Sequence, residues 1–333
     1  MSQLCLIRAS GNIGTVLAPQ GIVEVARLAK SYGSRLVLHD LSFTVRAGEV
    51  VGLLGPNGAG KTTTLSILAT LRAADAGTVR IAGFDLRAHP AAIRRKLGFV
   101  PQAIALYPSL SAYQNLDLFA RVQGLSASEA RRSCAAALEE VELSDRASDP
   151  VATLSGGMKR RLNLACGVVH RPEVLLLDEP TVGVDPQSRE KILRTIRNLA
   201  GAGATVIYST HYMDEVERIC DRVLLIDRGR LVAAGTVAEV VALAGEHPRI
   251  EITFEREPPP NWCARPLLSV NSVAGAERNK VELKLDNLAQ VSEVLEQARV
   301  AGGRVLEFSV HSPNLSDAFM TLTGRALRDA EPA

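Results

Sequence analysis

The chain has 333 residues, which exceeds the usual size of a single hydrophobic core and predicts two domains. Hydrophobic residues make up 47 %, enough for a packed core, and the net charge of +2 is too balanced to indicate a nucleic-acid partner. The five cysteines are scattered, odd in number and without metal-ligand spacing, so we expect ordinary buried thiols in a reducing compartment.

Residues 1–21 are expected to form a flexible tail, because they are rich in glycine and lack the basic and long apolar segments of a signal peptide. No apolar run in the sequence approaches the ~18–20 residues needed to cross a bilayer. We therefore predict a cytosolic protein that reaches a membrane only through another protein.

Two kinds of hydrophobic pattern predict the fold of the first 240 residues. Alternating residues predict short strands at 22–25, 41–45 and 78–83, with a turn at 30–33. Continuous apolar runs at 174–177, 205–211 and 223–227, separated by helical segments, are typical of strands buried on both faces of a parallel sheet. Residues 111–143 are expected to be mostly helical. This order predicts an α/β fold with a parallel core sheet.

One segment matches the phosphate-loop pattern G-x-x-x-x-G-K-[ST], and it reads Gly55-Pro56-Asn57-Gly58-Ala59-Gly60-Lys61-Thr62. It joins a predicted strand at 49–54 to a predicted helix at 61–71, where unpaired N–H groups and the positive end of the helix dipole face an anion. Its glycines let the backbone approach phosphate oxygens closely. Lys61 can then reach the β- and γ-phosphates, and the Thr62 hydroxyl can bind Mg²⁺. Thr63, the next residue of the helix, is included in the nucleotide-binding set.

Two adjacent carboxylates, Asp178 and Glu179, follow the apolar run at 174–177. Asp178 is suited to hold Mg²⁺ through water, and Glu179 to act as general base toward the attacking water. In a chain with a phosphate loop, such a pair at a strand end favours a functional site over buried structural carboxylates.

With these motifs in this order, residues 22 to about 240 resemble an ATP-binding cassette (ABC) ATPase. Leu154-Ser155-Gly156-Gly157-Met158 is similar to the family signature L-S-G-G-Q, with Met158 in place of the glutamine. That variant is common in the exporter branch that handles drugs, polysaccharides and lipids, which includes the daunorubicin-resistance-like ATP-binding proteins.

The resemblance also assigns roles to single residues. Gln102 matches the Q-loop, Asp185 the D-loop, His211 the switch histidine and Tyr32 the aromatic that stacks on adenine, a contact of about 1–3 kcal/mol by analogy with other base stacking. It implies ATP and Mg²⁺ as cofactors. The implied catalytic residues are Glu179, His211 and Gln102, and the implied metal ligands are Thr62, Gln102 and Asp178.

The signature residues Ser155, Gly156 and Gly157 open a helix, yet they lie on a helical arm away from their own phosphate loop. In the family they close on the γ-phosphate bound by the partner subunit. The resemblance thus implies two kinds of partner: a second copy or a related cassette, and a separately encoded transmembrane permease. The permease would contact the arm, at about residues 102–154, and hold this chain peripherally at the cytoplasmic face of the membrane.

The expected fold is an ABC-type nucleotide-binding domain over residues 22–244, with a mixed sheet around the phosphate loop, an antiparallel β part and a helical arm. The composition changes near Gly245, and residues 245–333 predict a small accessory α+β domain with strands at 250–254, 281–285 and 305–310 and helices at 288–301 and 315–322. The segment 314–325 resembles the closing segment of many drug-exporter ATPases. A stabilising or dimerising appendage and a regulatory unit both remain open.

The function we expect is that of the ATPase subunit of a two-component exporter. The alternative is a soluble ABC ATPase that is not coupled to transport. Translation-factor types typically carry two cassettes, and DNA-repair types separate the phosphate loop from the signature by long coils, whereas a compact segment joins Lys61 to Ser155 here. An importer ATPase is a lesser alternative.

Overall fold

A computed structural model describes residues 21–245, 247–259, 262–263, 267–270 and 279–324 of the chain. The described residues divide into two compact units, one up to Val240 and one from Val241 onward, and the division falls within α8 (Val237–Leu243). The predicted N-terminal tail at 1–21 lies outside the described residues except for Gly21.

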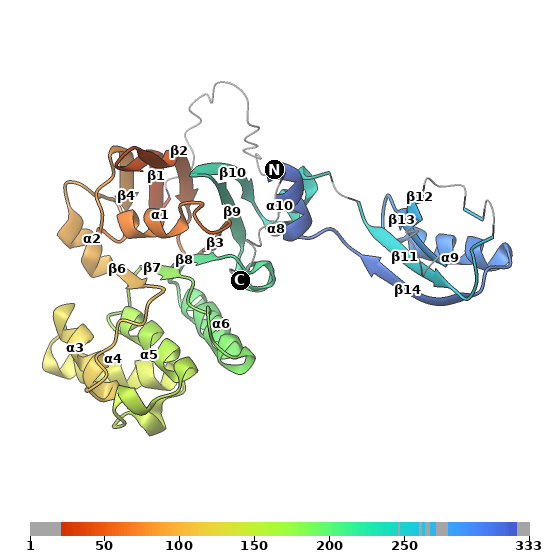
Figure 1. Ribbon diagram of the computed structural model, residues 1–333. Helices are drawn as coiled ribbons and strands as arrows, with labels where there is room; N and C mark the ends of the chain where they lie inside the picture. Colours follow the sequence, from red (N-terminus) through yellow and green to blue (C-terminus); the bar gives the residue numbers. More distant parts are fainter. Residues whose placement is uncertain (1–20, 246, 260–261, 264–266, 271–278, 325–333) are drawn as a thin grey trace. The chain divides into compact units, whose positions relative to one another are not determined.

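The centre of the first unit is a six-stranded sheet in the order β10-β9-β3-β8-β7-β6 (Figure 1). Its strands are β3 (Val50–Leu54), β6 (Leu97–Val100), β7 (Val174–Asp178), β8 (Thr205–Thr210), β9 (Arg222–Asp227) and β10 (Arg230–Gly235). Five of them are parallel, and only β10 runs antiparallel to its neighbour β9. Every residue of β3, β7 and β8 is buried, which confirms the prediction of strands covered on both faces.

A second, antiparallel sheet has the order β2-β1-β4-β5, with β1 (Val23–Tyr32), β2 (Arg35–Val45), β4 (Ala76–Ile81) and β5 (Phe84–Asp85). The turn predicted at 30–33 begins too early, because residues 30–32 still belong to β1. Tyr32 pairs with Arg35 of β2, and a two-residue connection joins the two strands. Apolar residues of β1 and β2 share one core with α1 (Lys61–Leu68) and with the face of the larger sheet that α1 covers. The fold is therefore mixed α/β, as predicted.

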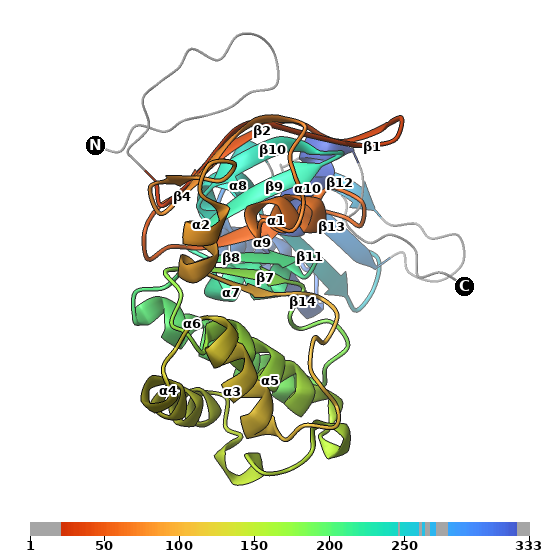
Figure 2. The same cartoon turned by 90° about the vertical axis from the view of Figure 1, so that its left-hand side faces the viewer.

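Three helices form an arm that extends from one end of the larger sheet (Figure 2): α3 (Ala112–Val122), α4 (Ala127–Glu140) and α5 (Gly156–Val168). They have a core of their own, built largely from alanine and leucine with the two buried thiols Cys134 and Cys166. A capping box at Ser126 and Glu129 begins α4, and a second one at Ser111 and Gln114 begins α3. This unit also contains α2 (Pro90–Lys96), α6 (Pro186–Gly201) and α7 (Met213–Ile219), with short 3-10 helices at Ser144–Arg146 and Val151–Thr153.

Parallel pairing brings distant segments to one edge of the larger sheet. Leu54 lies beside Thr210, and Asp178 lies beside Ser209, so the chain leaves β3, β7 and β8 at the same level. Gly55, the first residue of the phosphate loop, follows β3, while Glu179 follows β7 and His211 follows β8. The fold thus collects the phosphate loop and two candidate residues that lie more than 100 positions after it at the carboxyl ends of adjacent strands.

The second unit is a four-stranded antiparallel sheet in the order β12-β13-β11-β14, with β11 (Arg249–Phe254), β12 (Leu267–Val270), β13 (Lys280–Lys284) and β14 (Val305–His311). Helix α9 (Gln290–Val300) shares a core with it, and α10 (Leu315–Thr323) begins with a capping box at Asn314 and Asp317. The predicted strands and helices of the C-terminal region are confirmed, whereas β12 was not foreseen. Among all the helices that the structure describes, none combines the length and apolar character that a membrane span requires.

Candidate active site

The phosphate loop depends on glycine at positions where a side chain cannot fit. A Cβ on Gly55 would lie 2.1 Å from the carbonyl oxygen of Ile226, and one on Gly60 would lie 2.6 Å from Leu38 Cδ2. Gly60 also has a left-handed φ of 106° and is the N-cap of α1. No side chain caps this helix and its first turn carries no acidic residue, so its N–H groups are left to face a ligand. This cradle fits the phosphate groups of a nucleotide.

Three predicted residues meet on the carboxylate of Glu179. The Lys61 ammonium nitrogen lies 3.4 Å from Glu179 Oε1, and His211 Nδ1 lies 3.3 Å from the same oxygen. Gln102 Nε2 donates to Glu179 Oε2 at 3.1 Å. Lys61 also donates to the backbone oxygens of Gly55 at 2.7 Å and Pro56 at 3.2 Å, inside the loop that precedes it.

The surroundings of Glu179 keep it ionised. Burial acts to raise its pKa, but the hydrogen bond with His211 and the charge of Lys61 outweigh burial and hold the pKa below its ordinary value. A buried carboxylate that stays charged can accept a proton or orient a water molecule. Glu179 also adopts a left-handed backbone conformation with φ 47°, which turns the chain sharply at the end of β7.

Asp178 forms a second group with two hydroxyl side chains. The Thr62 hydroxyl donates to Asp178 Oδ1 at 3.3 Å, and the Ser209 hydroxyl donates to the same oxygen at 2.6 Å. Burial raises the pKa of Asp178, and these two hydrogen bonds offset it only in part. Carboxylate and hydroxyl oxygens are hard donors of the kind that Mg²⁺ prefers, so this set fits that ion together with nucleotide phosphates.

The sequence reasoning missed Ser209 and Arg160. Ser209 is a fully buried residue of β8 with no motif to mark it. Arg160, on α5, donates to the backbone oxygens of Gln102 and Val182, so the signature helix fastens the segment that carries Gln102. No local pattern in the sequence marks Arg160, because its burial on α5 is a property of the tertiary structure.

Tyr32 lies at the end of β1 with 40 % of its surface exposed. Two cations flank its ring, with Lys30 Nζ 5.7 Å and the Arg72 guanidinium 5.4 Å from the ring centroid. An exposed aromatic with cations nearby can present a face to a base and charges to phosphates.

The predicted signature and D-loop residues form a separate group, at the N-termini of α5 and α6. The Ser155 hydroxyl accepts a hydrogen bond from Met158 N at 3.2 Å, and the Asp185 carboxylate accepts one from Ser188 N at 2.8 Å. Gly157 lies against the start of α6, because a Cβ there would come within 2.0 Å of the Ser188 hydroxyl oxygen. Gly156, in contrast, has open space around it. The structure thus couples these two motifs to each other.

A phosphate loop, an oxygen pair for a metal ion and an ionised carboxylate at the adjacent strand end together define a nucleoside triphosphatase of the phosphate-loop class. Comparison with known proteins narrows the class. Residues 38–182 match the family described as "ABC transporter". The linearmycin resistance ATP-binding protein LnrL of Bacillus subtilis is 41 % identical over 314 residues, which cover 92 % of this chain and 100 % of that protein.

Two further similarities agree with that result. The Nod factor export ATP-binding protein I of Ralstonia nicotianae is 37 % identical over 308 residues, covering 92 % of this chain and 95 % of that protein. Among solved structures, a dimeric ATP-binding cassette in a post-hydrolysis state with ADP and Pi is 28 % identical, with a TM-score of 0.59 over 64 % of this chain and 98 % of that one. The chain belongs to the ABC transporter family and is an ATP-binding cassette ATPase.

Proposed function

We propose that this chain is the ATP-hydrolysing subunit of a two-component exporter and works with a separately encoded transmembrane permease. The observation that carries the proposal is the meeting of Lys61, Gln102 and His211 on one ionised carboxylate, Glu179. Relatives named for export and for drug resistance match over most of the chain, which supports transport and disfavours a soluble ATPase without a permease. The same matches favour an exporter over an importer.

Residues 22–244 form the nucleotide-binding domain in this proposal. ATP phosphates lie on the loop from Gly55 to Thr63, and adenine stacks on Tyr32. Lys61, which is paired with Glu179 in this structure, turns toward the β- and γ-phosphates when ATP is bound. Glu179 then accepts a proton from the attacking water, while His211 and Gln102 keep the carboxylate in place.

Thr62, Asp178 and Gln102 are the residues that would hold Mg²⁺. When bound, Mg²⁺ neutralises charge that develops on the phosphate oxygens. Gln102 uses its amide nitrogen on Glu179, so its amide oxygen is the atom that can turn to the metal. Chelation of divalent cations should therefore abolish hydrolysis, and added Mg²⁺ should restore it.

Two copies of the chain, or this chain and a related cassette, close on ATP in our proposal. Ser155, Gly156 and Gly157 lie at the N-terminus of α5, and Asp185 lies beside them at the start of α6. This group completes the ATP site of the partner subunit rather than its own. ATP is contacted fully only in the closed pair, so its binding shifts the open–closed equilibrium toward that pair. Hydrolysis of ATP then lets the two cassettes separate.

Glu179→Gln tests this assignment, since the amide keeps the shape of the side chain and removes the base. The variant should bind Mg-ATP and form a dimer that dissociates when ATP is removed, measured by size-exclusion chromatography. Its hydrolysis should fall by ~10²–10⁴-fold, the usual contribution of a general base. Ser155→Arg in the same chain should abolish the dimer.

Glu173→Gln is the matched control, because Glu173 precedes the same strand but is an exposed partner of Lys96. It should hydrolyse ATP normally. If Glu179→Gln hydrolyses ATP at the unmutated rate, Glu179 is not the base and the site is assigned wrongly.

The membrane location follows from the same proposal. The permease contacts the helical arm, at about residues 102–154, and holds the chain at the cytoplasmic face of the membrane. Residues 245–333 form an accessory domain. Cell fractionation should find the chain on membranes when the permease is present and in the soluble fraction when it is deleted. Equal membrane association in both strains would contradict this location.

A further inference from the structure

A fully buried carboxylate, Glu215, lies close to the active site and takes no part in the mechanism above. It belongs to α7, and its Oε2 accepts hydrogen bonds from the Tyr208 hydroxyl at 2.5 Å and the Thr210 hydroxyl at 2.9 Å. Burial, with the charge of Glu215, holds the pKa of Tyr208 well above its ordinary value, so this hydroxyl stays protonated and donates. Both donors lie on β8, the strand that ends next to His211.

The positive charge that faces Glu215 comes from a different helix. Arg189 Nε lies 3.4 Å from Glu215 Oε1, and Arg189 is in the first turn of α6, where its backbone N–H donates to the Asp185 carbonyl oxygen at 2.9 Å. A carboxylate without solvent needs such a charge beside it. The ion pair therefore fixes α7 and the end of β8 to the helix that Asp185 opens.

The guanidinium of Arg189 also contacts the ring next to the switch histidine. Its central carbon lies 4.6 Å from the Tyr212 ring centroid, within the range of a cation–π contact. The Tyr212 ring lies in turn 4.2 Å from the His211 ring, centroid to centroid, with the planes tilted by 40°. His211 reaches Glu179 at 3.3 Å. Continuous contacts thus run from the buried ion pair to the carboxylate of the active site.

We propose that Arg189 is a positioning residue that holds His211 against Glu179 through the ring of Tyr212. The inference rests on the proposed roles of Glu179 and His211. The backbone beside the imidazole is already fixed, because Tyr212 N donates to the Thr210 hydroxyl at 3.0 Å. The orientation of the imidazole ring remains to be fixed, and the tilted Tyr212 ring that packs against it restrains that orientation.

Arginine is suited to make both contacts at once. Its planar guanidinium pairs with a carboxylate at its edge and stacks on an aromatic ring with its face, whereas a lysine ammonium keeps the charge and loses the flat stacking surface. Because Arg189 lies one turn after Asp185, a movement of the start of α6 also displaces Arg189 and, through the Tyr212 ring, His211. A partner subunit that displaces Asp185 would thereby change how His211 is held.

The test uses the full-length chain and separates kcat from KM. Arg189→Lys and Tyr212→Leu should each lower kcat for ATP hydrolysis roughly tenfold, within the ~100-fold that a misplacement of about 1 Å can cost. KM should stay within about twofold, because neither residue belongs to the nucleotide-binding set. Tyr212→Phe keeps the stacked ring and should retain the unmutated kcat.

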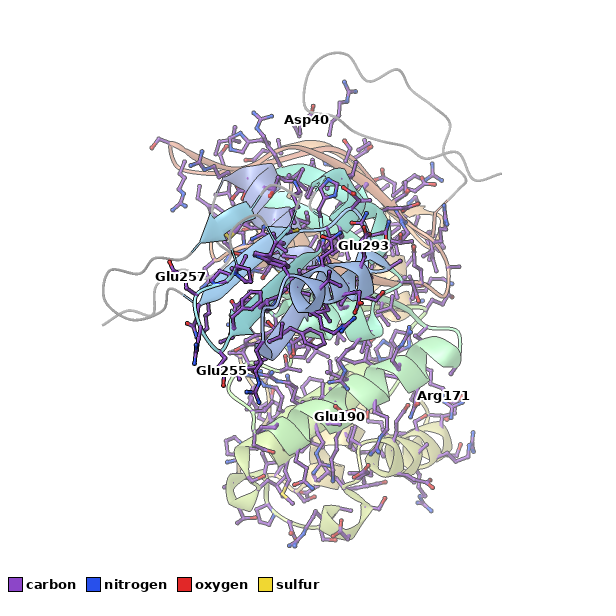
Figure 3. The ribbon with its side chains drawn as sticks, turned by 90° about the vertical axis from the view of Figure 1, so that its right-hand side faces the viewer. Asp40, Arg171, Glu190, Glu255, Glu257 and Glu293 are labelled. Atoms are coloured by element: carbon purple, nitrogen blue, oxygen red, sulfur yellow. The ribbon has the colours of Figure 1, made fainter. Side chains whose placement is uncertain are left out.

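A double-mutant cycle identifies the route of the effect. In a His211→Ala chain, assayed by single turnover, Arg189→Lys should cause no further loss, because the residue through which it acts is gone. Glu190→Gln is the matched control. Glu190 is the next residue of α6 (labelled in Figure 3), and it makes an exposed ion pair with Arg218 of α7 at 2.7 Å. This variant breaks a contact between the same two helices and should leave kcat unchanged.

Three results would overturn the inference: an unmutated kcat in Arg189→Lys, an equal loss in Tyr212→Phe and Tyr212→Leu, or losses that multiply in the His211→Ala chain. A failure of the proposed function gives a different result. In that case His211→Ala itself would hydrolyse ATP at the unmutated rate, which would remove the role of His211 and this inference with it.

Discussion

The hydroxyl of Ser209 should decide how tightly the site holds Mg²⁺. It donates to Asp178 Oδ1 at 2.6 Å and accepts from Glu179 N at 3.2 Å, so it touches both carboxylate residues at the end of β7. Ser209→Ala removes both contacts and leaves Asp178 with the longer hydrogen bond from Thr62, at 3.3 Å. Glu179 N keeps a partner, because it also donates to the backbone oxygen of Ser209 at 3.1 Å.

The expected magnitudes follow from that difference. A hydrogen bond to a charged group contributes about 1.5–3 kcal/mol, and we expect a loss at the lower end for the free energy of unfolding, since Asp178 and Glu179 each keep another hydrogen-bond partner. Loss of a group that orients a metal ligand typically lowers metal affinity ~10–100-fold. We expect roughly tenfold, because Thr62 still restrains Asp178.

Two assays on the full-length chain measure these effects. Urea unfolding gives the change in stability, and the Mg²⁺ concentration for half-maximal hydrolysis at fixed ATP gives the change in metal affinity. Thr205→Val is the matched control. Thr205 is a fully buried residue at the opposite end of β8, where its hydroxyl accepts from Gly48 N at 3.0 Å. The Thr205→Val chain should lose stability and keep the Mg²⁺ dependence of the unmutated chain. An unmutated Mg²⁺ dependence in Ser209→Ala would refute the reasoning.

Three other predictions concern the phosphate loop, the thiols and the accessory domain. Gly55→Ala should abolish ATP binding in calorimetry, because its Cβ would lie 2.1 Å from a backbone oxygen of β9, whereas Gly201→Ala, with open space, should bind normally. Burial raises the pKa of Cys134 to about 11 and that of Cys166 further still, so neither thiol should react with Ellman's reagent at neutral pH before unfolding; prompt labelling of either of these two residues in the folded chain, located by peptide mapping, would contradict this. A chain that ends near residue 245 should still bind ATP, and loss of binding in a truncated chain with a folded circular-dichroism spectrum would refute the proposed domain division.

Contiguous motifs could be predicted from the sequence because their physics is local. The phosphate loop needs glycine where φ is positive or where a Cβ would clash, and it needs a lysine and a threonine at the first positions of the following helix. All these requirements fall within eight neighbouring residues. Buried parallel strands show in the sequence for a similar reason, since a strand covered on both faces must be apolar at every position.

The sequence predicted the ends of helices and strands less well than their presence. The helix expected over 61–71 stops at Leu68, where Thr70 takes a left-handed conformation with φ 60°. No single residue type marks such an end, in contrast to the end of α10, where Gly324 has φ 70°. Strands β10 and β12 were not foreseen, because short strands at the edge of a sheet need not be apolar on both faces.

Family resemblance supplied Gln102 and His211, but only the tertiary structure shows that both reach Glu179. Their meeting depends on the strand order β3-β8-β7-β6, which hydrophobic periodicity does not encode. Ser209, Arg160 and Arg189 have no local signature at all. A buried hydroxyl or an arginine in a helix acquires its role from the groups that packing places beside it, and in this chain those groups come from other strands and helices.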